Sequence, residues 1–171
     1  MPEPVASRPV FRGRHVRVEE EEWPGLGTWE VVRPLDAAGV LALTPSDEVV
    51  LVRQFRAPVR VALLEIPAGL LDVEGEDPRD CAARELLEET GYRATSFEPL
   101  ARFHPSAGHS SELVHLFRAR TGARPVGSPE HGLELVIRPF REAVADARAG
   151  RFADAKTALA LLLADARTPA G

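Results

Sequence analysis

Residues 69–92 read GLLDVEGEDPRDCAARELLEETGY, and this stretch carries the clearest helix signals in the sequence. Asp77 is suited to cap a helix because its carboxylate can accept hydrogen bonds from free backbone amides, and Pro78 fits the first helical position. Gly91 favours the left-handed conformation that ends a helix. The stretch therefore predicts a helix over residues 78–90 that packs onto a sheet through its apolar positions. These positions are Cys81, Ala82, Leu86 and Leu87.

The predicted helix gathers three carboxylates on one face, because Glu85, Glu88 and Glu89 are spaced at i, i+3 and i+4. Like charges at this spacing repel, and negative charge near the C-terminal end of a helix opposes the helix dipole. Such local conflicts are expected at functional sites. Carboxylate oxygens suit a hard cation, Mg²⁺ or Mn²⁺. The alternative is a solvated acidic face in which Arg84 and Glu88 form an i, i+4 ion pair.

The same stretch resembles the Nudix box, G-x5-E-x7-R-E-U-x-E-E-x-G-U, in which U is aliphatic or aromatic. The matching positions are Gly69, Glu76, Arg84, Glu85, Leu86, Glu88, Glu89, Gly91 and Tyr92. One departure occurs before the helix, where six residues rather than five separate Gly69 from Glu76. Because the extra residue lies outside the helix, the spacing of the glutamates is unaffected. The resemblance implies a Nudix hydrolase with the corresponding fold.

Motifs on both sides of the box are similar to those of the ADP-ribose pyrophosphatase branch of this superfamily. They are RQFR at 53–56, EIPAG at 65–69, GEDP at 75–78 and PSAGHSSE at 105–112, and the similarity spans about residues 28–165. The resemblance implies metal-dependent hydrolysis of ADP-ribose, a nucleoside diphosphate sugar, to AMP and ribose 5-phosphate. The alternatives are another nucleotide sugar, a dinucleotide, or nucleotide binding without turnover. A module of the last kind is expected to have lost the box glutamates, which this chain keeps.

The resemblance also assigns roles to residues of the box. Glu85 and Glu89 are implied as metal ligands, with Glu88 contributing directly or through water. The backbone carbonyl of Ala68 is implied as a further ligand. Arg84 is interpreted as an orienting partner of the carboxylates. Arg84 and Glu88 are therefore counted among the catalytic residues.

Four residues outside the box are candidates for substrate contacts. Arg56 can bind phosphate oxygens as a fork of donors, or it is a surface arginine on an edge strand. Trp29 and Glu30 are similar to the segment that holds adenine in some family members, where Trp29 would stack on the base and Glu30 would accept from its amine. Trp29 can equally be a core or interface residue. Glu112 ends the loop at 105–112 that resembles the family's substrate loop.

A general base is expected on a mobile segment, because the helix glutamates are committed to the metal. The loop GSPEHG at residues 127–132 offers Glu130, and related pyrophosphatases carry an acidic residue in this loop. Glu134, on the strand that follows, is the rival assignment. The alternative for Glu130 is a solvent-exposed loop residue without a catalytic role.

The rest of the chain predicts an α/β (α+β) fold, in which a mixed β-sheet is sandwiched between helices. Strands are predicted over residues 39–43, 49–54, 61–66, 97–103, 112–120 and 133–139, and helices over residues 141–149 and 156–165, the last capped by Asp154. Residues 16–32 predict an N-terminal β-hairpin. We expect N-terminal strands at 1–36 that form a homodimer and part of the substrate pocket, and a Nudix domain at 37–168. Residues 168–171 are expected to fray.

Composition limits the partners of this 171-residue chain. The net charge of −5, from 21 basic and 26 acidic residues, disfavours a nucleic-acid partner. The longest apolar run, residues 158–164, is too short to span a membrane. Cys81 is the single cysteine and is interpreted as a core residue, and the five histidines lack a zinc-like spacing. The N-terminus lacks the features of a signal peptide, so we expect a small-molecule enzyme of the cytoplasm.

Overall fold

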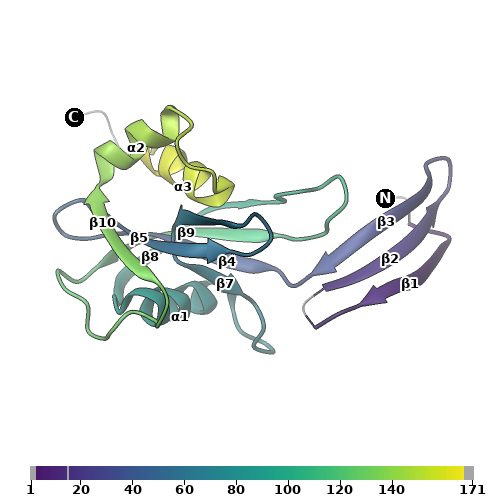
Figure 1. Ribbon diagram of the computed structural model, residues 1–171, viewed down its shortest axis with the longest axis horizontal. Coiled ribbons are helices and arrows are strands. Elements are labelled where there is room, and N and C mark those ends of the chain that lie inside the picture. Colours follow the sequence, from purple (N-terminus) through teal and green to yellow (C-terminus); the bar gives the residue numbers. More distant parts are fainter. Residues whose placement is uncertain (1–2, 15, 168–171) are drawn as a thin grey trace.

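The computed structural model describes residues 3–14 and 16–167 and divides into an α/β body and a separate N-terminal sheet (Figure 1). The body contains seven strands, and five of them follow the order β10-β5-β4-β9-β8, while β6 pairs with β5 and β7 with β4. The strands are β4 (Ala37–Leu43), β5 (Glu48–Arg56), β6 (Val61–Glu65), β7 (Ala68–Leu70), β8 (Ala94–Phe103), β9 (Val114–Thr121) and β10 (Glu134–Pro139). The β4–β9 pair is parallel and the other pairs of the body are antiparallel. The predicted mixed sheet is confirmed.

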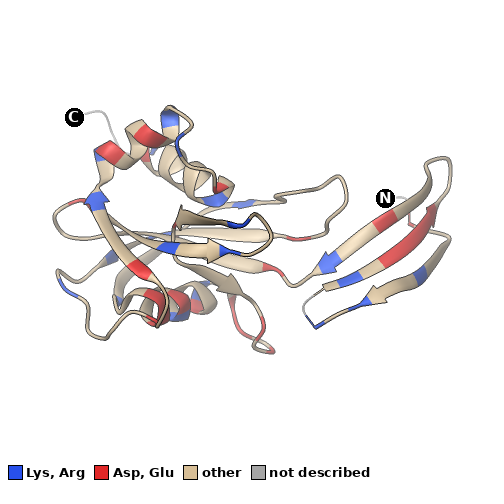
Figure 2. Ribbon diagram, viewed as in Figure 1, with Lys and Arg blue, Asp and Glu red and all other residues tan. Residues whose placement is uncertain are grey.

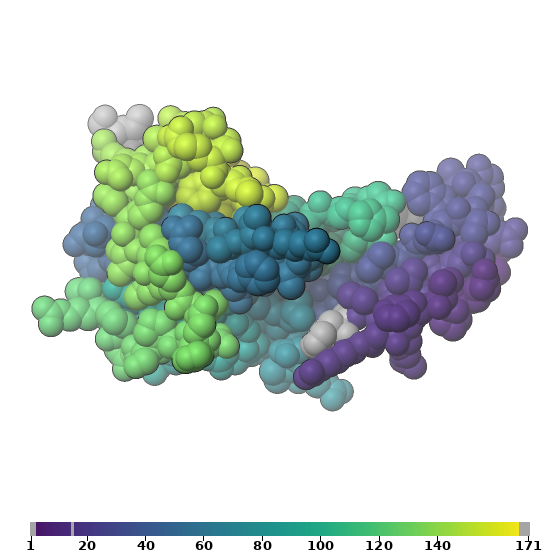
Figure 3. All heavy atoms as spheres, viewed as in Figure 1, coloured from purple at the N-terminus to yellow at the C-terminus, as the bar shows by residue number. Residues whose placement is uncertain are grey.

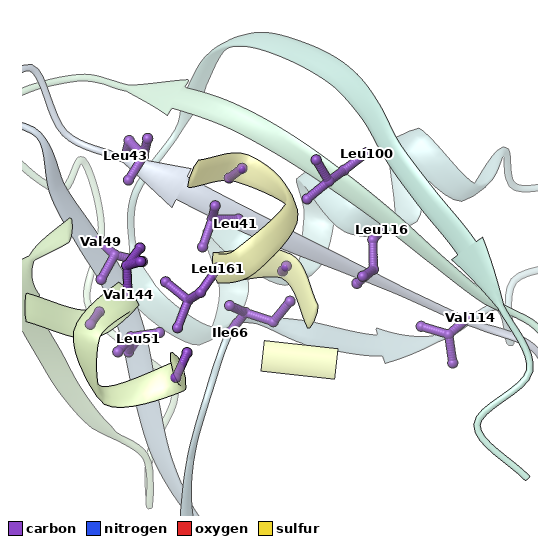
Figure 4. Packing of buried hydrophobic residues seen from close by; sticks show 14 residues of the cluster. Leu41, Leu43, Val49, Leu51, Ile66, Leu100, Val114, Leu116, Val144 and Leu161 are labelled. Atoms are coloured by element: carbon purple, nitrogen blue, oxygen red, sulfur yellow. The ribbon is translucent and has the colours of Figure 1, made fainter. Parts of the chain in front are cut away.

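Helices cover both faces of this sheet. α1 (Pro78–Thr90) packs on one face, and α2 (Phe140–Arg148) and α3 (Ala155–Ala166) pack on the other. Because side chains of a strand alternate between faces, β4 serves two cores: Val40 and Ala42 join the cluster under α1, whereas Leu41 and Leu43 join the cluster under α2 and α3 (Figure 4). The predicted sandwich is therefore confirmed. None of the helices in the described residues has the length and apolarity needed to cross a membrane.

The predicted helix caps are present. Asp77 accepts a hydrogen bond from the amide of Arg79 at 2.8 Å, and Gly91 has a φ of 73° and donates to the carbonyl of Leu87 at 2.8 Å. Asp154 caps α3 by accepting from the amide of Thr157 at 2.9 Å. The ends of α1 and α3 therefore follow from short-range sequence signals.

Two details of the body differ from the sequence-based expectation. Leu87 is only half-buried, while Cys81, Ala82 and Leu86 are fully buried, because Leu87 lies at the margin of the face of α1 that packs on the sheet. Residues 68–70, which lie outside the predicted strands, form the short strand β7. Its pairing with Ala37–Gly39 of β4 is a long-range contact that a local pattern does not reveal.

The N-terminal sheet consists of β1 (Ala6–Arg12), β2 (Val16–Trp23) and β3 (Gly27–Pro34) in that order. The predicted β2–β3 hairpin is confirmed, and β1 adds an edge strand that was not predicted. Pro9 lies at an irregularity of the β1–β2 register, which is a position where an edge strand tolerates proline. The sheet extends away from the body, as the purple region of Figure 3 shows.

Two backbone hydrogen bonds join the N-terminal sheet to a loop of the body. The amide of Val32 donates to the carbonyl of His109 at 2.8 Å, and the amide of Ser111 donates to the carbonyl of Val32 at 3.1 Å. The loop that connects β8 to β9 is therefore fixed to β3.

Replacing Gly91 by alanine should destabilise the protein more than the same change at Gly150. Both glycines have a left-handed φ, of 73° and 69°, which costs alanine about 1 kcal/mol. At Gly91 a Cβ atom would also lie 2.2 Å from the carbonyl oxygen of Gly127, whereas at Gly150 no atom lies within 4 Å. Urea unfolding should show that Gly91→Ala lowers the free energy of unfolding by about 1–3 kcal/mol more than Gly150→Ala does. If both variants lost the same free energy of unfolding, residues 125–127 would not pack against the end of α1.

Candidate active site

The carboxylates of α1 face β7, and a glycine makes their approach possible. A Cβ atom on Gly69 would lie 2.2 Å from the carboxyl carbon of Glu85. Only a residue without a side chain therefore allows Glu85 to occupy this position. The neighbouring amide of Ala68 donates to Oε2 of Glu89 at 3.1 Å. Ala68, Glu85 and Glu89 thus meet at the contact between β7 and α1.

Arg84 lies among the carboxylates and donates hydrogen bonds to three of them. Its Nε and Nη2 donate to the two carboxylate oxygens of Glu76 at 2.9 and 3.0 Å. Its Nη1 donates to Glu85 at 2.6 Å and to Glu88 at 3.2 Å. The hydrogen bonds to Glu76 are the main reason that the pKa of Arg84 is raised, and they hold the pKa of Glu76 below its usual value. The i, i+4 pair of Arg84 and Glu88 is present as one part of this larger network.

Glu89 is the most deeply buried of the three glutamates, with 5% of its surface exposed. Burial raises the pKa of Glu89 to about 7; the charges of Glu85 and Glu130 act in the same direction, while the amide of Ala68 and the charge of Arg56 oppose the rise. Among the described residues no ion pair involves Glu89. The carboxylate is therefore buried without a direct counter-ion, which is unfavourable when it is charged.

Glu85 and Glu88 differ in their exposure. The Glu85 side chain is 14% exposed, and its burial raises its pKa, which Arg84 partly offsets. The Glu88 side chain is 55% exposed. In the described part of the chain, no three His, Cys, Asp or Glu side chains converge closely enough to hold a metal ion.

The residues nevertheless fit a hard divalent cation. All the candidate donors are oxygens, which Mg²⁺ and Mn²⁺ prefer. Glu89 lacks a cation partner, and Gly69 leaves the side of Glu85 that faces β7 free of side-chain atoms. The donor set and its charge therefore suit a metal ion that would share the glutamates with Arg84.

A second group of charges surrounds Glu65, which is 1% exposed. Arg56 donates to both of its carboxylate oxygens, from Nε at 2.7 Å and from Nη2 at 2.8 Å, and Lys156 binds the same carboxylate. Lys156 also contacts Asp154 at 2.9 Å. Burial opposes ionisation of Glu65, but the hydrogen bonds of Arg56 and the charge of Lys156 outweigh it and lower its pKa.

Sequence reasoning missed this network, although two signals were available. Lys156 is the single lysine of the chain, and Glu65 opens the EIPAG motif. β5 is not an edge strand, because it pairs with both β10 and β6. Glu65 holds the guanidinium of Arg56, whose side chain is 39% exposed.

The sequence of the chain is similar to those of several known proteins. The family model described as NUDIX domain matches residues 33–160. The chain is 34% identical to a methanol dehydrogenase activator of Bacillus methanolicus over 165 residues, which cover 92% of this chain and 89% of that protein. It is 39% identical to an ADP-ribose pyrophosphatase of Bacillus subtilis over 67% of this chain and 64% of that protein. It is 38% identical to a GDP-mannose pyrophosphatase of Yersinia enterocolitica over 68% of this chain and 66% of that protein.

The chain belongs to the Nudix family. The matches confirm the predicted Nudix pyrophosphohydrolase and its relation to the ADP-ribose pyrophosphatase branch. The aligned part spans just under two thirds of the length of these two pyrophosphatases. The extra residue between Gly69 and Glu76 does not disturb the Nudix box, because Arg84 still reaches Glu76, Glu85 and Glu88.

The two candidate bases of the Nudix site have different surroundings. Glu130 lies in the loop between β9 and β10, is exposed, and its charge contributes to the raised pKa of Glu89. Glu134 begins β10 and forms an ion pair with Arg53, with Oε2 3.1 Å from Nε. Glu130 is therefore electrostatically coupled to the carboxylate site, while Glu134 is already engaged on the sheet.

Trp29 lines a cavity of about 280 Å³ between the N-terminal sheet and the β8–β9 loop. Its indole is 45% exposed and donates to the carbonyl of Leu26 at 3.2 Å. Glu30 is exposed and lies opposite Glu20 in the β2–β3 register, outside the residues that line the cavity. The structure therefore places Trp29 in a candidate base pocket but does not bring Glu30 into it.

Two charged residues that sequence reasoning missed line the same cavity. They are Glu21, which is 3% exposed, and Arg33, which binds it. Glu21 belongs to the acidic stretch of β2 that is red in Figure 2, and it also accepts from Trp23 at 3.0 Å. Glu21 therefore differs from a solvated glutamate of an acidic strand, because Arg33 and Trp23 bind its buried carboxylate.

Glu112 lies in the same loop as His109 but faces another region. The pKa of Glu112 is raised, mainly by burial. The charge of Lys156 opposes this rise, and the charge of Asp36 adds to it. Glu112 is therefore near Lys156 of the Glu65 network rather than in the Trp29 cavity. Burial also raises the pKa of the Cys81 thiol to about 12, which agrees with a structural role for this residue.

The raised pKa of Glu89 predicts a pH-dependent stability in buffer free of divalent metal. An unfolded glutamate ionises near 4.5 and the folded one near 7, so the unfolded state gains stability as the pH rises through this window. The free energy of unfolding should fall by roughly 3 kcal/mol between pH 4.5 and 7 relative to Glu89→Gln. Urea titrations of both proteins across this range check the prediction. Parallel pH profiles would show that burial of Glu89 does not perturb its ionisation.

Proposed function

We propose that this Nudix protein hydrolyses the pyrophosphate bond of ADP-ribose to AMP and ribose 5-phosphate. The observation that carries the proposal is that Glu85 and Glu89 meet β7, while Arg84 joins Glu85 to Glu88. This arrangement concentrates negative charge where a metal ion and a pyrophosphate can be bound together. The similarity to an ADP-ribose pyrophosphatase supports the substrate, and the cavity at Trp29 offers a place for the base.

Glu85, Glu88, Glu89 and the carbonyl of Ala68 would hold the metal, Mg²⁺ or Mn²⁺. When bound, such an ion neutralises phosphoryl charge and lowers the pKa of a bound water. Arg84 keeps Glu85 and Glu88 in place through Nη1 while Glu76 anchors its other side. Arg84 therefore acts as an orienting residue, and Glu88, the most exposed of the three glutamates, is the one most open to water.

Arg56 would bind a substrate phosphate. Glu65 holds its Nε and Nη2, and in the described residues no hydrogen bond is formed by Nη1. The charge of Arg56 lowers the pKa of Glu89, so the guanidinium lies within electrostatic range of the carboxylate site. A phosphoryl oxygen bound at Nη1 would thus lie between the fixed arginine and the metal ligands. Glu112, near Lys156, would line the substrate on the same side.

Glu130 would act as the general base that removes a proton from the attacking water. The Glu130→Gln variant should lower kcat with little change in KM, because only the transition state loses its proton acceptor. Glu134→Gln is the matched control, since it breaks the ion pair with Arg53 without altering the loop. Steady-state kinetics of both variants make the test. A crippled Glu134→Gln beside a normal Glu130→Gln would move the assignment to Glu134.

Trp29 would stack on adenine, and Glu30 would reach the base only from the rim of the cavity or from a partner chain. Loss of the stacking surface in Trp29→Ala should raise KM by an amount that corresponds to about 1–3 kcal/mol. Since the cavity at Trp29 is lined by none of the Nudix-box glutamates, kcat should change little. Kinetics with ADP-ribose and with ribose 5-phosphate as competitor check this. An unchanged KM would remove Trp29 from the base site.

A homodimer would cover the N-terminal sheet. All seven residues of β1 are exposed, and so are the apolar side chains of Val10 and Phe11. A three-stranded sheet that extends away from the body buries little apolar surface, so pairing with a second copy would stabilise it. Sedimentation velocity should show a dimer, and a fully active monomer at assay concentration would disprove it.

A substrate panel tests the proposed activity. ADP-ribose, GDP-mannose, NADH and diadenosine polyphosphates would each be assayed with Mg²⁺ and with Mn²⁺. The highest kcat/KM is expected for ADP-ribose. A preference for GDP-mannose would replace the substrate while keeping the chemistry, and binding without turnover of any compound would instead support a nucleotide-binding module.

A further inference from the structure

A second cavity lies on the face of the sheet that α1 does not cover. Its volume is about 1230 Å³, and it is enclosed by the end of β4, by β9, by α2 and by the end of α3. Four arginines line it, namely Arg118, Arg120, Arg141 and Arg148, whereas the lining contains only two carboxylates, Asp47 and Asp165. The cavity is therefore a positively charged hollow in a chain whose net charge is −5.

The α2 wall presents one continuous stripe to this cavity. Arg141, Val144, Ala145 and Arg148 all line it, and their spacing of i, i+3, i+4 and i+7 places them on one helix face. The two guanidinium groups thus flank an apolar centre. Val144 is 4% exposed and belongs to the core beneath α2. This wall is therefore part of a helix that packs on the core, and not part of a loop.

The sheet supplies the opposite wall. Arg118 and Arg120 follow Leu116 on β9, and the alternation of a strand puts all three side chains on the face that α2 and α3 cover. In the parallel pairing Arg118 lies beside Leu41 and Arg120 beside Leu43 of β4. The apolar core under α2 and α3 therefore changes into an arginine-rich surface at this end of the strands.

The arginines are not fully neutralised by the protein. Arg118 contacts Glu98 at 3.3 Å, Arg120 contacts Asp47 at 2.6 Å, and Arg148 contacts Asp165 at 2.5 Å. Within the described residues no ion pair involves Arg141. The three pairs are partly exposed, with 58% and 69% of the Glu98 and Asp47 side chains open to water. Exposed pairs of this kind are weak and can yield to a more highly charged anion.

The cavity is separate from the Nudix site. β7, which carries Ala68 and Gly69, pairs with Ala37–Gly39 at the start of β4, whereas the cavity reaches Leu43 at its end. The Leu43 side chain also belongs to the core on the face opposite α1. A ligand in the cavity therefore contacts neither the glutamates of α1 nor Arg56.

We propose that this cavity binds a small molecule with a diphosphate group, at a site distinct from the hydrolytic one. Arginine forks match phosphoryl oxygens, and a concave wall with an excess of positive charge focuses the field on an anion. Phe140 and Val144 provide an apolar surface for an organic part of the ligand. Inorganic pyrophosphate and a nucleoside diphosphate share the recognised group.

Calorimetric titration with inorganic pyrophosphate, ADP and adenosine, in the presence of EDTA, tests the proposal. The double variant Arg141→Gln/Arg148→Gln removes two exposed arginines of the cavity without a core change. Arg102→Gln is the matched control, because Arg102 is exposed on β8 and pairs with His115 rather than lining the cavity. The wild type and the control should bind both phosphate compounds, and the double variant should bind them at least tenfold more weakly.

Two further measurements complete the test. Adenosine should not bind detectably, and the double variant should hydrolyse substrate at the wild-type rate, which separates this site from the Nudix site. Tighter binding of ADP than of pyrophosphate would assign the site to nucleotides, and equal binding would assign it to the diphosphate alone. Equal affinities of the wild type and double variant, binding of adenosine as tight as ADP, or no binding to the wild type would overturn the proposal.

Discussion

Repulsion among Glu85, Glu88 and Glu89 is the constraint around which this protein is arranged. The three carboxylates share one helix face, and two of them are buried against β7, where burial raises their pKa values. Gly69 lets the helix approach, the amide of Ala68 binds Glu89, and Arg84 joins Glu85, Glu88 and Glu76. Glu89 still lacks a direct cation partner, and this is the deficit that a bound divalent ion would remove.

Much of the body follows from short-range sequence signals. The ends of α1 were predictable from Asp77, Pro78 and Gly91, because a cap depends on residues within one turn of the helix. The glutamate spacing likewise fixed which side chains share a face. The apolar runs that became β4 and β5 were clear because strands buried on both faces carry few polar residues. These features require no knowledge of distant partners.

Most features that sequence reasoning missed depend on distant pairing. β7 exists because of β4, and the setting of Arg56 depends on Glu65 and Lys156, which are far apart in the chain. The arginine-lined cavity joins β9 to α2 in the same way. The surroundings of the β8–β9 loop also depend on distant residues. His109 binds β3, while Glu112 lies near Lys156. This loop therefore lies between the Trp29 cavity and the charges near the Nudix site. The cytoplasmic location stays a prediction.

The proposed hydrolysis depends most on the buried carboxylates of α1 as the metal site. Electron paramagnetic resonance of Mn²⁺ titrated into the protein measures this directly, without substrate. Glu74→Gln is a suitable control for Glu89→Gln, because Glu74 is an exposed carboxylate of the loop before α1. The wild type and Glu74→Gln should bind Mn²⁺ with equal affinity, and Glu89→Gln should bind it at least tenfold more weakly. Equal Mn²⁺ affinity in all three proteins would contradict the account.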